Sequence, residues 1–136
     1  MATQHKETVL LVEDCQDSRD TFRFMLQSLG YLVVDAGDAE EAAQRSHDHP
    51  GRIDVLLTDV MLPAMRGGEL ADLLTAADSE LRVILMSGYP AEIAAAKGRP
   101  FLQKPFTVDE VDRAIRGTLD SKAPRAAADR EPVSKE

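Results

Sequence analysis

Short apolar runs recur along the chain and are separated by longer stretches of mixed character. Within each run the apolar residues are consecutive and do not alternate with polar ones. Continuous runs of this kind are typical of strands that are covered on both faces of a parallel sheet. The pattern predicts strands at residues 8–12, 31–36, 53–58, 82–86 and 100–103.

Helical spacing dominates between the runs. The stretch after the first run predicts a helix that is capped by Asp17 or Ser18 and ended by Gly30. The same spacing marks a third helix after Gly67 and Gly68 and a last helix that ends at Leu119. Apolar residues repeat at i, i+3, i+4 and i+7 in these stretches, as Phe22, Met25, Leu26 and Leu29, as Leu70, Leu73 and Leu74, and as Val108, Val111, Ile115 and Leu119.

Two capping boxes and two helix breakers complete this pattern. Asp38 with Glu41 opens a helix that runs through Ser46, and Thr107 with Glu110 opens the last helix. The stretch 91–96 is expected to form a fourth helix that is about two turns long at most or is partly irregular, because Gly98 and Pro100 stop it early. Alternating strands and helices predict an α/β fold with a parallel sheet and helices on both faces.

Composition limits the class of protein. The chain has 136 residues, which fits one domain, and a net charge of −8, which argues against nucleic acid and anionic membranes as partners. One cysteine, Cys15, and no signal-peptide pattern favour a cytoplasmic protein. We expect a short extension at 1–7, a domain at 8–119 and a disordered tail at 120–136.

Polar residues follow four of the five predicted strands directly. Glu13 and Asp14 follow the first, Asp59 the third, Ser87 the fourth and Lys104 the fifth. In an open parallel sheet, the carboxyl ends of the strands form the ligand-binding edge. Clustered carboxylates suit Mg²⁺, an aspartate can accept a phosphoryl group, and a lysine can pair with either the carboxylate or the phosphate. The sequence therefore predicts a phosphoryl site at this edge.

Four motifs resemble the receiver domain of two-component response regulators: "VLLVED", "LLTDVMLP", "ILMSGY" and "LQKPF". The resemblance covers residues 8–119 and implies a flavodoxin-like, doubly wound fold with a five-stranded parallel sheet in the order 2-1-3-4-5. It also implies Mg²⁺ as the cofactor, with Mn²⁺ able to replace it.

The same resemblance implies a role for each matching residue. Asp59 would be the phospho-acceptor, assisted by Lys104 and Ser87. Asp14, Asp59 and the backbone carbonyl of Met61 would bind the metal, and Glu13 would act on it through water. Phe101 matches the aromatic switch position, while Met61 and Tyr89 match the positions that tune the lifetime of the phosphate.

The chain departs from the receiver pattern in three places. Ala64 and Arg66 replace residues of a loop that usually reads Pro-Gly-Met-Asp-Gly, and Phe101 lacks the hydroxyl of the commoner tyrosine. The expected fourth helix is also shorter than in the receiver pattern, and it lies at the face that receivers often use for output or dimerisation.

Three functions remain open from the sequence. The first is a phospho-acceptor regulator that is phosphorylated by a histidine kinase or phosphotransfer protein and acts on an unidentified protein, with no output domain or substrate turnover of its own, as a monomer or a weak phosphorylation-dependent dimer. The second is a degenerate receiver that binds partners without phosphorylation. The third is a Mg²⁺-dependent phosphohydrolase, which Met61 disfavours because such enzymes need an aspartate at that position.

Overall fold

The computed structural model describes residues 7–121, except the side chains of residues 94 and 95. Strands and helices alternate throughout this range, as the sequence predicts. The strands are β1 (Thr8–Val12), β2 (Leu32–Ala36), β3 (Val55–Asp59), β4 (Arg82–Ser87) and β5 (Phe101–Gln103). The helices are α1 (Gln16–Ser28), α2 (Ala39–Asp48), α3 (Gly67–Ala77), the 3-10 helix η1 (Pro90–Ala96) and α4 (Val108–Asp120).

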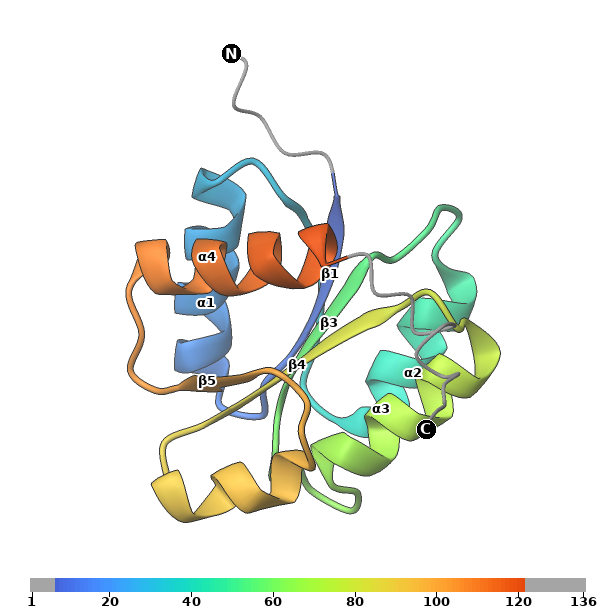
Figure 1. Cartoon of the computed structure of the whole chain (residues 1–136). Helices are drawn as coiled ribbons and strands as arrows, with labels where there is room; N and C mark the ends of the chain where they lie inside the picture. Colours follow the sequence, from blue (N-terminus) through green and yellow to red (C-terminus); the bar gives the residue numbers. More distant parts are fainter. Residues whose placement is uncertain (1–6, 122–136) are drawn as a thin grey trace.

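The strands form one parallel sheet in the order β2-β1-β3-β4-β5, which confirms the flavodoxin-like α/β fold. Figure 1 shows α1 and α4 on one side of this sheet and α2 and α3 on the other. None of the helices that the structure describes is both long and apolar enough to cross a bilayer.

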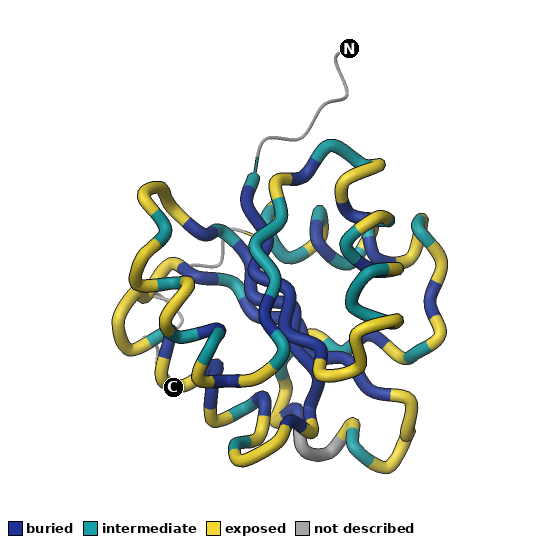
Figure 2. Tube along the Cα trace, turned by 180° about the vertical axis from the view of Figure 1, so that it is seen from behind, coloured by how far each residue is buried: buried dark blue, intermediate teal, exposed yellow. Residues whose placement is uncertain are grey.

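The hydrophobic core lies in two layers, one on each face of the sheet. Leu10 and Leu56 pack with α2 and α3 on one face, and Leu11 and Leu57 pack with α1 and α4 on the other. Figure 2 shows the buried strands running through the centre of the molecule. Successive side chains of a strand point to opposite faces, so a strand between two helical layers must be apolar at every position. The continuous runs in the sequence have this cause.

The start of α1 differs from the prediction. We expected Asp17 or Ser18 to cap this helix, but it begins at Gln16 and Cys15 is the N-cap residue. The backbone N–H of Cys15 instead donates to the Glu13 carboxylate at 3.0 Å. The predicted end is confirmed, because Gly30 has a φ of 95° and its N–H donates to the Gln27 carbonyl at 2.9 Å.

The capping boxes are confirmed in α4 and in part in α2. Thr107 and Glu110 exchange both expected hydrogen bonds at the start of α4. Asp38 caps α2 by accepting from the Glu41 N–H at 2.7 Å, but the Glu41 carboxylate accepts from Gly37 rather than from Asp38. The N–H of Gly37, one residue before the N-cap, thus takes part in this cap in place of the N–H of Asp38.

The fourth helix is short, as predicted, and takes the 3-10 form of η1. Lys97 and Gly98 follow with φ values of 52° and 85°, which no helix can continue. At the other end of the domain, α4 runs one residue beyond the predicted boundary, to Asp120. Residues 1–6 and 122–136 lie outside the described residues, so the predicted disordered tail stays a prediction.

Candidate phosphoryl and metal site

The strand register brings the predicted site residues to one edge of the sheet. Val12 pairs with Thr58, so Glu13 and Asp59 lie side by side one residue further along. Asp59 pairs with Met86, directly before Ser87, and Ser87 pairs with Gln103, directly before Lys104. The alignment of neighbouring strands therefore places an acid, an acid, a hydroxyl and an amine across four adjacent strands.

Lys104 joins two of the buried carboxylates. Its Nζ atom lies 2.6 Å from Glu13 Oε1 and 2.6 Å from Asp59 Oδ1. The ammonium also stands over the ring of Phe22, 5.6 Å from the ring centroid. Glu13 and Asp59 are almost inaccessible to solvent, at 2% and 6% exposure. Two buried acids thus share one cation, and the trio carries a net negative charge.

The pKa values follow from this imbalance. Burial raises the pKa of Asp59 to about 7, and the charge of Glu13 adds to the rise while Lys104 opposes it. Burial also acts to raise the pKa of Glu13, but hydrogen bonds from Lys104 and the Cys15 N–H outweigh it and leave that pKa below its usual value. The two carboxylates hold the pKa of Lys104 above its usual value in spite of burial. Asp59 is therefore the acid that most needs further positive charge.

A metal ion would supply that charge. Glu13, Asp14 and Asp59 each offer a carboxylate oxygen, and these oxygens all lie within 4.8 Å of one another. Asp14 is exposed, so it can bind an ion that keeps several of its waters, as Mg²⁺ does. The donor set consists of hard oxygens and fits Mg²⁺. The predicted role of the Met61 carbonyl stays a prediction.

The loop after Asp59 is held against the strand by a close backbone approach. A Cβ atom at Gly67 would lie 2.0 Å from the Asp59 carbonyl oxygen, so only glycine fits there. The Gly67 N–H donates to the Val60 carbonyl at 2.8 Å. Inside the loop, Ala64 keeps a φ of 68°, the left-handed conformation that the usual glycine adopts without cost. The loop thus holds Ala64 in a left-handed conformation although this residue has a side chain.

Arg66 gives the rim of the site a cation where the receiver pattern has aspartate. It is the N-cap residue of α3, but a guanidinium has no acceptor for the first N–H groups of a helix. Its Nη1 atom lies 3.6 Å from the Met61 sulfur, and Met61 is half exposed. The side chain of Arg66 therefore does not cap α3. It lies instead against the side chain of Met61, two residues after Asp59.

Ser87 is buried at the end of β4, and the Tyr89 N–H donates to its hydroxyl oxygen at 3.0 Å. The hydroxyl in turn donates to the carboxylate of Glu92 in η1. Tyr89 is 70% exposed, whereas Phe101 is half-buried and packs against the core layer of α2 and α3. The structure thus buries Ser87, covers Phe101 in part and leaves Tyr89 on the surface.

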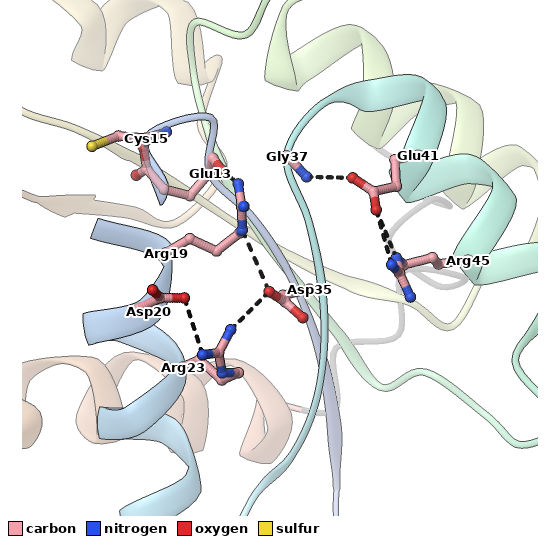
Figure 3. A network of polar contacts seen from close by, with 9 residues as sticks. All are labelled: Glu13, Cys15, Arg19, Asp20, Arg23, Asp35, Gly37, Glu41 and Arg45. Atoms are coloured by element: carbon pink, nitrogen blue, oxygen red, sulfur yellow. Dashed lines mark hydrogen bonds and ion pairs between the residues drawn. The ribbon is translucent and has the colours of Figure 1, made fainter. Parts of the chain in front are cut away.

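Sequence reasoning missed Arg19, which Figure 3 shows between the acidic loop and β2. Its Nη1 atom donates to the Glu13 backbone carbonyl at 2.7 Å, and its Nε atom lies 3.4 Å from Asp35. Arg23 pairs with the same Asp35 carboxylate at 3.0 Å. Arg19 therefore fixes the backbone that presents Glu13 and Asp14. Its position one turn into α1, facing the loop before it, was the signal available in the sequence.

Fold and site together define a doubly wound α/β protein with an acidic cluster and a lysine at the carboxyl edge of its sheet. The family model for the response regulator receiver domain matches residues 9–116. The chain therefore belongs to the response regulator receiver family. Its acidic cluster of Glu13, Asp14 and Asp59 is typical of the phospho-acceptor site of that family.

Two relatives from Brucella abortus (strain 2308) differ in how much of their length the chain covers. The chain is 34% identical over 119 residues to the sensor kinase CckA, which is 83% of this chain but 12% of the kinase. It is 30% identical over 116 residues to the response regulator receiver protein CpdR, which is 82% of this chain and 95% of CpdR. A receiver domain implies a histidine kinase as its partner.

Solved structures agree with the fold. The receiver domain of the hybrid histidine kinase CckA is 29% identical, with a TM-score of 0.71 over 82% of this chain and 98% of that one. The response regulator TrrA of Thermotoga maritima, solved in complex with Mg²⁺ and BeF, is 23% identical, with a TM-score of 0.75 over 83% of this chain and 99% of that one. The chain thus shares its fold with a response regulator that was solved with Mg²⁺ and BeF.

Proposed function

We propose that Asp59 accepts a phosphoryl group from the phosphohistidine of a histidine kinase or phosphotransfer protein, and that the phosphorylated chain changes its contacts with another protein. The observation that carries this proposal is the shared position of Asp59, Lys104 and the metal-competent acids at one edge of the sheet. Mg²⁺ bound there would neutralise the phosphoryl oxygens as the group is transferred.

The transfer itself is a balanced exchange of one bond for another. A carboxylate oxygen of Asp59 attacks phosphorus, the P–N bond of the phosphohistidine breaks, and the imidazole leaves with the electron pair and takes up a proton. Lys104 lies 2.6 Å from Asp59 and can follow the phosphoryl oxygens with its ammonium group. Burial of Asp59 keeps bulk water away from the new acyl phosphate. The chain would catalyse its own phosphorylation and dephosphorylation and turn over no further substrate.

Acetyl phosphate with Mg²⁺ tests this proposal. We expect the mass of one phosphoryl group on the wild type, no adduct on Asp59→Asn, and an unchanged adduct on the control Asp109→Asn, an exposed acid in the first turn of α4. An adduct that persists in Asp59→Asn, or one that never forms on the wild type, would overturn the proposal.

The second candidate is a degenerate receiver that binds its partner without phosphorylation. The 3-10 form of η1 favours it, because receivers often use the fourth helix at their output face. Under this alternative, beryllofluoride with Mg²⁺ would leave the NMR spectrum of the protein unchanged. The phosphohydrolase has less support, since Met61 offers no acid beside Asp59.

A further inference from the structure

The hydroxyl of Ser87 is already engaged in this structure. It accepts from the Tyr89 N–H at 3.0 Å and donates its proton to Glu92 Oε1. Ser87 is 4% exposed, so water does not replace these partners. A serine hydroxyl has one proton to donate. It can therefore serve the carboxylate of Glu92 or another acceptor, but not both.

A phosphoryl group on Asp59 would be such an acceptor. Asp59 pairs with Met86 across the sheet, so Ser87 is the next residue of the neighbouring strand. A phosphoryl oxygen on Asp59 is a strong acceptor of the Ser87 proton, and its negative charge repels the carboxylate of Glu92. Phosphorylation of Asp59 would thus weaken the Ser87–Glu92 hydrogen bond in two ways. The phosphoryl oxygen competes for the one proton of Ser87, and its charge repels the Glu92 carboxylate.

Glu92 belongs to a segment that can respond. It lies in η1, and its own N–H donates to the Tyr89 carbonyl at 2.9 Å within a single 3-10 turn. Turns of this kind are weakly held. The neighbouring side chains of Tyr89 and Ile93 are 70% and 50% exposed, so little packing resists a movement of the first part of this segment, whereas Ala96 at its end is buried in the core.

We infer that Glu92 is a positioning residue that holds the Ser87 hydroxyl in the unphosphorylated protein, and that a phosphoryl group on Asp59 displaces it and releases the segment 89–93. The inference rests on the proposed phosphorylation of Asp59 and names the regulation of that same site. Because linkage is reciprocal, the Ser87–Glu92 hydrogen bond must weaken phosphoryl binding by the same factor by which phosphorylation weakens that bond. The surface that reports phosphorylation would then be the exposed pair Tyr89 and Ile93.

The test measures the affinity for beryllofluoride, a phosphoryl mimic, at saturating Mg²⁺ by NMR titration of the full chain. We expect Glu92→Ala to bind it about fivefold more tightly than the wild type, as loss of one competing charge-assisted hydrogen bond implies. Glu92→Gln keeps an acceptor without the charge and should fall between, at about twofold. The control Glu40→Ala removes an exposed acid from the first turn of α2 and should leave the affinity unchanged.

A double-mutant cycle separates the hydrogen bond from plain charge removal. In a Ser87→Ala background, Glu92→Ala should no longer change the affinity, because no hydroxyl remains to be released. An equal gain with and without the hydroxyl, or no gain in either background, would overturn the role of Glu92 and leave phosphorylation intact. A wild type that binds no beryllofluoride while it stays folded by circular dichroism would overturn both proposals.

Discussion

The two halves of the candidate site differ in how they are held. Glu13 and Asp59 are buried at the ends of the inner strands β1 and β3, and Lys104 joins them through contacts of 2.6 Å. Ser87 is equally buried, but its partner Glu92 stands on a 3-10 turn between exposed side chains. The chemistry of group transfer needs fixed geometry, whereas a signal needs a part that can move. In this molecule the fixed residues and the movable contact of Ser87 with Glu92 thus lie at the ends of different strands of one sheet.

Hydrogen exchange gives the largest expected contrast between the two halves. Amides of β1 and β3, such as Leu11 and Leu57, should exchange only on global unfolding, whereas the Glu92 amide should exchange through local opening of η1. We expect rates that differ by at least about a thousandfold, measured by NMR without phosphoryl donors. Similar rates for Glu92 and Leu57 would mean that η1 is as firmly held as the central strands.

Among the substitutions, replacing Lys104 should destabilise the group formed by Glu13, Asp59 and Lys104 most. Lys104→Ala leaves Glu13 and Asp59 buried without their shared cation and should lower the free energy of unfolding by about 3 kcal/mol at pH 8. The loss should be smaller at pH 5, where Asp59, with its pKa raised to about 7, is protonated. Urea unfolding in EDTA measures both values, and a loss that does not depend on pH would contradict this account of the trio.

Asp59→Asn should raise the free energy of unfolding, whereas Lys104→Ala should lower it. The fold raises the pKa of Asp59 to about 7, so the folded state holds the proton between the ordinary carboxyl pKa and that value. Stability is therefore lost as the pH rises through this interval, and it stays lost above it. Asparagine removes the loss and should raise the free energy of unfolding by about 2 kcal/mol at pH 8, but hardly at pH 4.

A second variant serves as the control for Asp59→Asn, and one result would contradict the prediction. Asp109→Asn, an exposed acid, should change the stability little at either pH. If Asp59→Asn destabilises the protein at pH 8 without metal, the pairing with Lys104 outweighs the cost of burying two acids.

The smallest effect concerns the loop that follows Asp59. Ala64 has a φ of 68°, which costs alanine about 1 kcal/mol. Ala64→Gly should relieve this cost and, after the greater freedom of glycine in the unfolded chain, stabilise the protein by about 0.5 kcal/mol. The same change at Ala43, inside α2, should destabilise it by about 1 kcal/mol. Thermal unfolding distinguishes the two signs, and a loss at both positions would refute the strain at Ala64.

Periodicity was enough to predict the order of the elements, because burial on both faces forces the strands to be apolar throughout. It also predicted that Glu13, Asp59, Ser87 and Lys104 lie along one edge of the sheet, since parallel strands end at the same edge. It failed at the start of α1, where the Glu13 carboxylate takes the N–H of Cys15. The contacts of Arg19 and Glu92 could not be predicted, because the direction of a long side chain depends on packing that no local pattern records.

Cys15 offers a natural point at which a spectroscopic probe can be attached near the site. It is the only cysteine of the chain, it is exposed, and its N–H is bound to Glu13 at 3.0 Å. A fluorinated or fluorescent group attached to its sulfur would be carried by the residue directly after Asp14, the exposed member of the acidic cluster, without any engineered residue. The chain thus carries its own attachment point for a probe, with which the arrival of an ion or a phosphoryl group could be followed in real time.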